Sequence, residues 1–178
     1  MDFETKTIKT SFRVATNANV GVKGLVVSSD KKRLLVNSSD RYMRLFNLPA
    51  TTKVDSSTSS STGPSGATSI TATPMVTLLN PVPELHKELI DAVNKQQWKT
   101  MIFSPDNELV LAGASHRHEH RIYFFNVYNG RLLKNLEGPK EGILDLTWHP
   151  TLPILVTVST AGTIYVWGAH QEESWSAF

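Results

Sequence analysis

The chain contains no cysteine, and its other scarcities exclude several classes of protein. Without a thiol among its 178 residues, it has no disulfide, no cysteine nucleophile and no Cys-bound zinc. No apolar run reaches 18 residues, so we expect no membrane-spanning helix. The opening Met1-Asp2-Phe3-Glu4 lacks the basic and then apolar pattern of a secretory signal, which predicts a soluble intracellular protein. The formal net charge of +2 permits contact with nucleic acid but does not require it.

Motifs that carry catalysis are missing as well. The sequence has no Gly-rich phosphate loop, no Gly-x-Ser-x-Gly elbow and no pair of carboxylates at strand ends. No sequence motif indicates a nucleophile or a general base. We therefore predict that the chain is not an enzyme and has no catalytic residue, metal site, cofactor or small-molecule substrate.

The sequence does contain one pattern that occurs three times: an apolar strand, a polar turn and a second apolar strand. A β-rich stretch ending in an aromatic residue follows each copy. The copies are residues 26–36, 102–111 and, more loosely, 146–156, and the aromatic residues are Phe46, Phe125 and Trp167. Phe125 and Trp167 are 42 residues apart, which is the length of one four-stranded propeller blade. The repetition predicts blade-like units arranged around a common axis.

The interval from Phe46 to Phe125 is longer, and a low-complexity tract explains the excess. Residues 51–74 are almost all Ser, Thr, Gly, Pro and Ala. Such a tract cannot bury enough apolar surface to offset its ordering entropy. We predict a disordered insertion within one blade, with a spacer role favoured over a phosphorylation target or docking arm.

The last strand of each unit fits the WD-repeat template, Asp-Gly-Thr-Ile-Arg-Leu-Trp-Asp. Residues 40–47, 119–126 and 161–168 fit it without a gap. The template acid remains as Asp40 and, conservatively, as Glu119, whereas Ala161 has lost it. The Gly-His pair that normally precedes a blade is absent, and Gly138-Pro139 stands in one such place. We expect degenerate repeats with an incomplete hydrogen-bond network.

The predicted fold class is all-β: a partial WD-repeat β-propeller of about two to three antiparallel blades out of a presumed seven. The chain is too short for all seven, so it is expected to be a fragment or to need a partner. The organisation is propeller strands in 1–48, the insertion in 49–82, further blades in 83–168 and the start of a C-terminal tail in 169–178. The expected strands are 6–14, 22–28, 33–37, 42–47, 98–104, 109–112, 121–126, 132–136, 143–148, 154–159 and 163–167, with a short one at 75–79.

Residues 83–97 admit two interpretations. Leu85, Leu89, Ile90 and Val93 recur at helical spacing after Pro83-Glu84, which favours a helix. A blade, however, needs its outer strand just before Trp98. We favour a strand at 87–93, because a third strand edge would otherwise stay unpaired.

The residues expected to hold the blades together are the template acid and the large aromatic side chains. They are Asp40, Phe46, Trp98, Phe125, Trp148 and Trp167. We expect the tryptophans to be buried between strands or blades rather than to serve as stacking platforms.

Residues 116–120, His-Arg-His-Glu-His, form the densest group of metal-ligand side chains. Histidines at i, i+2 and i+4 can share one side of a strand and hold a metal. The template places this stretch in the loop between two strands, so a solvated polar loop is the favoured interpretation. A contact of Arg117 and Arg121 with nucleic acid or an acidic partner is a further hypothesis.

The C-terminal half also resembles a known family, the WD-repeat subunits of COMPASS/MLL-type histone methyltransferase complexes, which include the retinoblastoma-binding protein 5 family. The resemblance rests on 103–104 with Asp106, on 112–115, 130–136 and 144–150, and on Trp175-Ser176-Ala177-Phe178. The last motif is the most specific, because ordinary WD repeats do not carry it.

The resemblance implies a nuclear, non-catalytic scaffold in a complex that methylates lysine 4 of histone H3. The implied partners are SET-domain, SPRY-domain and second WD-repeat subunits, together with a nucleosome contact. Trp175 and Phe178 would then be partner contacts at the start of the tail that activates the SET-domain subunit, while this chain is expected to lack the first blades and the tail. The alternative is a WD-repeat adaptor of another complex, such as a ubiquitin-ligase receptor or an RNA-processing scaffold.

Overall fold

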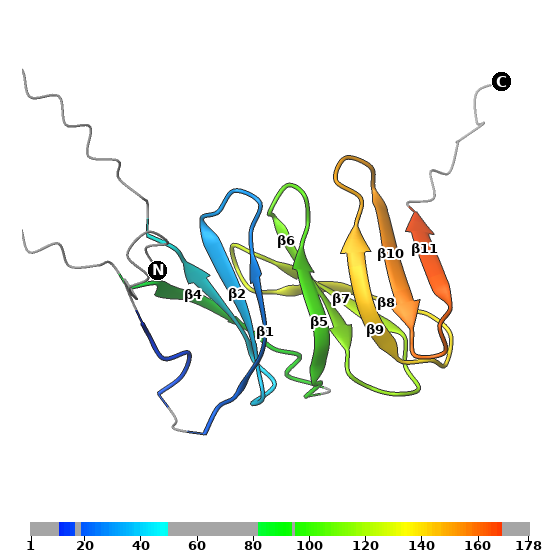
Figure 1. Ribbon diagram of the computed structural model, residues 1–178, viewed down its shortest axis with the longest axis horizontal. Helices are drawn as coiled ribbons and strands as arrows, with labels where there is room; N and C mark the ends of the chain where they lie inside the picture. The colour runs from blue at the N-terminus through cyan, green and yellow to red at the C-terminus, as the bar shows by residue number, and fades with distance from the viewer. Residues whose placement is uncertain (1–10, 17–18, 50–81, 94, 169–178) are drawn as a thin grey trace, which may run out of the picture.

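The computed structural model describes residues 11–16, 19–49, 82–93 and 95–168, which form eleven β-strands and no helix (Figure 1). The strands are β1 Val22–Val27, β2 Arg33–Ser38, β3 Met43–Asn47, β4 Glu84–Leu89, β5 Trp98–Phe103, β6 Leu109–Ala114, β7 Arg121–Asn126, β8 Leu132–Glu137, β9 Ile143–Trp148, β10 Ile154–Ser159 and β11 Ile164–Gly168. Since no helix occurs in the described part of the chain, none there could cross a membrane. The all-β prediction is confirmed.

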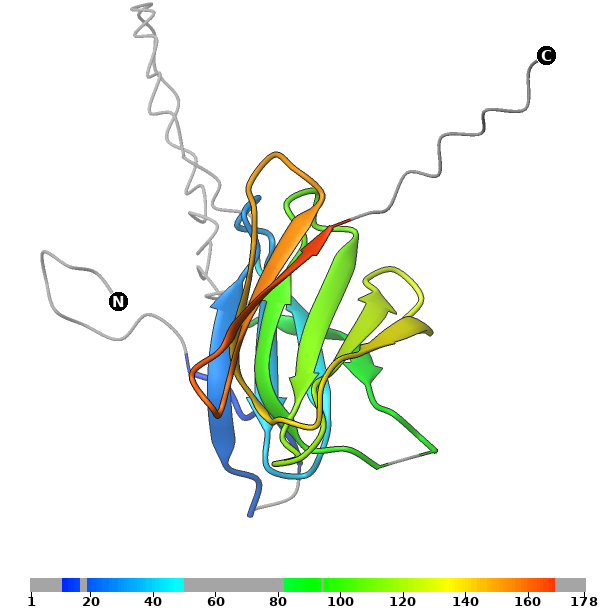
Figure 2. The same ribbon diagram turned by 90° about the vertical axis from the view of Figure 1, so that its right-hand side faces the viewer.

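The strands form three separate antiparallel sheets. Their orders are β1-β2-β3-β4, β5-β6-β7-β8 and β11-β10-β9. The inner strands β1, β5 and β9 adjoin one another in turn, and the sheets fan outward from them (Figures 1 and 2). The sheets are therefore three consecutive propeller blades, called blades 1, 2 and 3 below.

The repeated phrase becomes the same tight turn in blades 1 and 2. The backbone amide of Lys31 donates to the Ser28 carbonyl and that of Asn107 to the Ser104 carbonyl, each at 2.9 Å. Lys31 and Asn107 both have a left-handed backbone, with φ of 59° and 60°. In each turn an Asp two residues after the Ser accepts a hydrogen bond from the Ser hydroxyl. Two distant segments thus fold alike because they carry the same local hydrogen-bonding groups.

Packing between blades supplies the two hydrophobic cores. Alternating side chains of a strand point to opposite faces, so the strands of a blade contribute side chains to the interfaces with both neighbouring blades. The first core joins blades 1 and 2 and contains Leu35, Met43, Leu45, Leu89, Trp98, Met101, Phe103, Val110, Ala112, Ala114, Tyr123, Phe125 and Val127. The second joins blades 2 and 3 and contains Leu111, Ile122, Phe124, Ile143, Leu146 and Leu155.

The predicted strands match the observed ones closely, with two qualifications. Residues 84–89 form β4, so the strand interpretation of this region is confirmed and the helical one is wrong, although the strand begins earlier than predicted. The four-residue spacing of Leu85 and Leu89 also fits the two-residue alternation of a strand, so it does not by itself indicate a helix. A β-bulge opposite Leu45 and Phe46 shifts the register of β4, and Leu89 is buried whereas Leu85 is exposed. Residues 11–14 are not a strand, because they pair with no neighbouring strand in the described part of the chain. Residues 6–10, 51–73 and 75–79 lie outside the described residues.

Candidate interaction surfaces

A buried arginine organises the outer half of blade 1. Arg44 on β3 donates to Asp40 at 2.6 Å and to Glu88 on β4 at 2.8 Å, and its third contact is the Ser38 hydroxyl at 2.7 Å. Only 7% of its side chain is exposed. Burial disfavours the charged form of Asp40, but the hydrogen bonds from Arg44, Ser38 and the Tyr42 amide, together with the Arg44 charge, outweigh it and hold the pKa of this carboxyl below its usual value. The template acid therefore acts as an anchor for Arg44.

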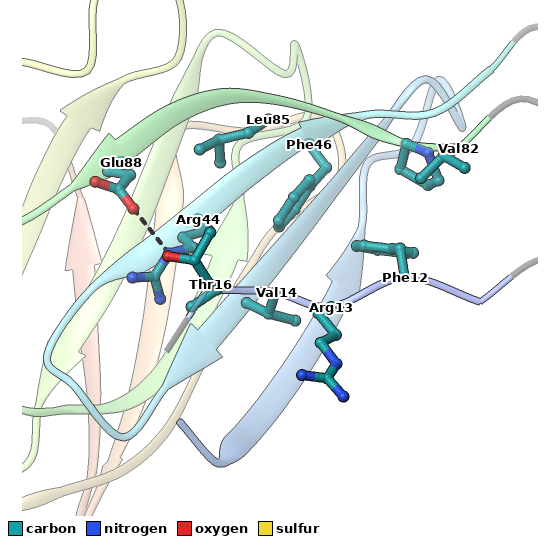
Figure 3. Close-up of a pocket in the computed structure, with 11 residues that line it drawn as sticks. Phe12, Arg13, Val14, Thr16, Arg44, Phe46, Val82, Leu85 and Glu88 are labelled. Atoms are coloured by element: carbon teal, nitrogen blue, oxygen red, sulfur yellow. Dashed lines mark hydrogen bonds and ion pairs between the residues drawn. The ribbon is translucent and has the colours of Figure 1, made fainter. Parts of the chain in front are cut away.

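A pocket of about 500 Å³ opens beside this ion-pair cluster. The segment Phe12–Thr16 forms one wall, while Phe46 and Leu85 lie opposite (Figure 3). The rings of Phe12 and Phe46 meet edge to face with centroids 5.2 Å apart. The pocket is apolar at its aromatic end and charged at the end where Arg44 and Glu88 meet, so it suits an amphipathic protein segment better than a small polar substrate.

Trp98 is the centre of the interface between blades 1 and 2. Its ring is 1% exposed and lies edge to face against Tyr123 and Phe125, with centroids 5.2 and 5.6 Å away. Its indole nitrogen donates to the Arg41 carbonyl of blade 1 at 2.9 Å. This one side chain therefore ties the two blades by packing and by a hydrogen bond.

His120 plays the matching role between blades 2 and 3. It is 1% exposed, stacks on Trp167 at 5.8 Å and places Nε2 2.7 Å from the Thr157 hydroxyl, which also accepts from the Trp167 indole at 3.0 Å. Burial lowers the pKa of His120, and the nearby carboxylate of Glu141 opposes that effect. The uncharged ring is thus the form that the interface accommodates.

Trp148 and Trp167, predicted to be largely buried, are partly buried in the structure. They pack against blade 2 from blade 3, Trp148 meeting Phe124 at 6.3 Å. No sheet covers the opposite face of blade 3 within the described residues. Phe46, Phe125 and Trp98 do lie in buried positions, at 3%, 0% and 1% exposure.

The loop of residues 116–120 is polar but not uniformly solvated. His116, Arg117 and His118 are exposed, whereas His120 is buried under blade 3, because Trp167 and Thr157 cover it. The described residues contain no group of three or more His, Cys, Asp or Glu side chains placed to hold a metal ion. The solvated-loop interpretation is therefore wrong for His120.

Arg117 and Arg121 are not equivalent candidates for a partner contact. Arg121 lies 3.0 Å from Glu137 and 3.8 Å from Glu119, so its charge is already paired. Arg117 is exposed at the tip of the loop. Trp175 and Phe178 lie outside the described residues.

Two residues that organise the structure were missed as site residues. Arg44 could have been suspected from its position four residues after Asp40, a spacing that keeps both on one strand-and-turn unit. Nothing local marks His120, because its partners Thr157 and Trp167 lie on the next blade.

Comparison with known proteins agrees with this architecture. The model of the family described as "WD domain, G-beta repeat" matches residues 130–168, which run from the end of blade 2 through blade 3. Retinoblastoma-binding-like protein E of Dictyostelium discoideum is 36% identical over the whole chain, which covers 28% of that protein. The Set1 complex component swd1 of Schizosaccharomyces pombe is 31% identical, again over the whole chain and over 37% of its own length.

A solved structure is similar as well. The β-propeller domain of Cps50 (Swd1) from Myceliophteria thermophila superposes with a TM-score of 0.72 at 26% identity, over 96% of this chain and 46% of that one. The chain thus spans about a third of the length of the curated relatives. It is a partial WD-repeat β-propeller, similar over its whole length to proteins named as retinoblastoma-binding protein 5 homologues and Swd1 components.

Proposed function

We propose that this chain serves as a non-catalytic scaffold in a COMPASS-type complex that methylates lysine 4 of histone H3. The observation that carries the proposal is homology across the entire chain to a named Set1 complex component and to retinoblastoma-binding proteins. A repeat that merely shared the propeller architecture would not need to match over every blade and the loops between them.

The use of polar groups within the blades supports a scaffold. Asp40 and Glu88 both pair with Arg44, and His120 is enclosed between two blades. The ion pairs join β3 to β4 within blade 1, and His120 joins blade 2 to blade 3, so both serve the packing of the propeller. A rigid set of blades lowers the entropy cost of assembling a complex, since its surfaces are ordered before the partners arrive.

The proposed partners are protein subunits: a SET-domain subunit, a SPRY-domain subunit and a second WD-repeat protein, acting in the nucleus. Trp175 and Phe178 are proposed partner contacts. Arg117 is the exposed cation that best suits the proposed nucleosome contact, because Arg121 is committed to Glu119 and Glu137.

Affinity purification tests the proposal directly. The tagged full-length protein should recover SET-domain methyltransferase subunits from nuclear extract, and its depletion should lower lysine-4 methylation of histone H3. Recovery of a ubiquitin ligase or of RNA-processing factors in their place, with methylation unchanged, would establish the adaptor alternative.

The nucleosome contact has its own test, in which the assembled complex carries Arg117→Glu. Methylation of nucleosomes should fall while methylation of a free histone H3 peptide stays constant. Arg131→Glu is the matched control, since Arg131 is exposed in the turn between β7 and β8. Equal loss on nucleosomes and on peptide would contradict a nucleosome contact.

A further inference from the structure

The hairpin that joins β7 to β8 presents exposed apolar side chains on the outer rim of blade 2. Tyr128 in the turn is 56% exposed, and Leu132 and Leu133 on β8 are 41% and 55% exposed. Blade 2 is the middle blade, with four strands and a described blade packed on each side. The hairpin therefore lies on the outer surface of a complete blade.

A β-bulge explains the exposure of one of these side chains. Phe124 pairs with Lys134 and Phe125 pairs with Leu132, so Leu133 is the extra residue on β8. A bulged residue has no direct partner across the ladder, and the strand bends around it. Leu133 belongs to neither hydrophobic core and is available on the surface.

Hydrogen bonds and packing fix the turn of this hairpin. The Asn126 carbonyl accepts from the Gly130 amide at 2.9 Å, and Asn126 Oδ1 accepts from the amides of Tyr128 and Asn129 at 2.9 and 3.1 Å. A Cβ added at Gly130 would lie 3.7 Å from Cβ of Lys87 on β4, so the turn packs closely on blade 1. The exposed side chains are thus held on an ordered support, which lowers the entropy cost of binding.

Cations surround the apolar residues. Arg33 of blade 1 lies over the Tyr128 ring, 5.3 Å from its centroid. Lys87 adjoins the turn from β4, while Arg131 and Lys134 flank the two leucines along the hairpin. Lys87, Arg131 and Lys134 are all exposed. Together the three apolar residues and these three cations are called the hairpin surface below.

The carboxylates on the same outer strands do not neutralise these cations. Glu88 on β4 pairs with Arg44 at 2.8 Å, and Glu137 on β8 pairs with Arg121 at 3.0 Å. Within the part of the chain that the structure describes, no ion pair involves a cation of the hairpin surface. The positive charge there is therefore available to a partner.

We propose that the hairpin surface binds an acidic segment of a partner protein that also carries aromatic or aliphatic side chains. The apolar side chains of the segment contact Tyr128 and Leu133, and its carboxylates pair with Lys87 and Lys134. Tyrosine and arginine are enriched among the residues that dominate binding at protein interfaces, and complementary charge around them speeds association. This inference does not depend on the methyltransferase proposal.

Charge and chemistry favour a protein segment of a partner over other occupants. Residues 50–81 of this chain connect β3 to β4, but they contain a single carboxylate, Asp55, and do not supply the complementary charge. A nucleic acid would bring a continuous run of phosphates. Glu84, which lies on the same face of blade 1 as Arg33, would repel that run, and the two leucines offer no ring on which bases could stack.

Fluorescence anisotropy with the full-length protein tests the proposal. The probe is a labelled synthetic peptide in which Leu and Phe alternate with Glu-Asp pairs. It should bind, and Lys87→Glu combined with Lys134→Glu should weaken binding at least about tenfold, because attraction is replaced by repulsion. Lys140→Glu is the matched control, since Lys140 is exposed in the loop at the other end of β8, and it should bind as wild type does.

Two further probes separate the contributions. A peptide with Ser in place of Leu and Phe should bind at least about tenfold more weakly, because it loses the apolar contacts. Leu133→Ser should weaken binding of the original peptide as well, without disturbing either core. Equal binding of the two peptides, an affinity unchanged by Lys87→Glu with Lys134→Glu, or tighter binding of a single-stranded oligothymidylate than of the acidic peptide would overturn the proposal.

Discussion

Protonation of His120 should weaken the contact between blades 2 and 3. The ring is buried against Trp167 and Tyr165, and its Nε2 shares a hydrogen bond with Thr157. Burial lowers the pKa of His120 in the folded chain below the value of about 6.5 that an unfolded chain has. The unfolded state therefore binds a proton first as the pH falls.

The sign and size of the effect follow from this difference. Above about pH 6.5, His120 is neutral in both states and its full contribution to stability is present. As the pH falls below that value, stability is lost at up to about 1.4 kcal/mol per pH unit, until the folded state is protonated too. The carboxylate of Glu141 raises the pKa of the ring and so limits the loss.

Urea unfolding followed by tryptophan fluorescence, at pH 7.5 and 5.5, measures this loss. Wild type should lose more stability than His120→Gln between the two values, by at most about 1.4 kcal/mol, since every other group titrates in both proteins. His116→Gln is the matched control, because His116 is exposed in the same loop and its removal should leave the wild-type difference intact. If His120→Gln does not fold, a titration of the wild-type ring by NMR replaces it. Equal pH dependence of wild type and His120→Gln, or a folded-state pKa at or above 6.5, would refute the reasoning.

Three further predictions concern stability. Trp98→Ala should cost about 3–5 kcal/mol of unfolding free energy, whereas Trp167→Ala should cost clearly less because Trp167 is half-buried; chemical denaturation compares them. Arg44→Met should cost about 1–3 kcal/mol by leaving carboxylates unpaired, and adding Asp40→Asn should restore part of the loss in a double-mutant cycle. Deleting 51–73 should leave folding intact and raise stability by about 1 kcal/mol at most, since it shortens the connection between β3 and β4; a lower melting temperature would show that the tract contributes contacts.

Most of the fold could be predicted from the sequence because its determinants are local. Alternating apolar residues define the strands, and the repeated Ser-x-Asp turn places two of the hairpins. The 42-residue interval between Phe125 and Trp167 then gives the blade. Even β4 could be predicted against its helical spacing, because the topology of a blade demands a strand there.

The parts that could not be predicted depend on contacts between blades. His120 belongs to a run of polar residues, and it is buried only because blade 3 packs against it. The half-burial of Trp148 and Trp167 depends on whether a sheet covers the far face of blade 3, which local pattern does not encode. Sequence specifies each blade more completely than it specifies the neighbours of the blade.

The interface between blades 2 and 3 also explains how a degenerate repeat can remain structured. Gly138-Pro139 stands where the template has Gly-His, so the histidine expected just before blade 3 is missing from that place. His120 of the neighbouring blade lies there instead: its Cβ would be 3.1 Å from a Cβ added at Gly138, and its ring reaches Thr157. Because Gly138 has no side chain, the hydrogen-bonding group can come from the adjacent repeat. In a repeat fold stability depends on contacts between nearest neighbours, so a repeat can lose its motif residue when its neighbour supplies an equivalent group.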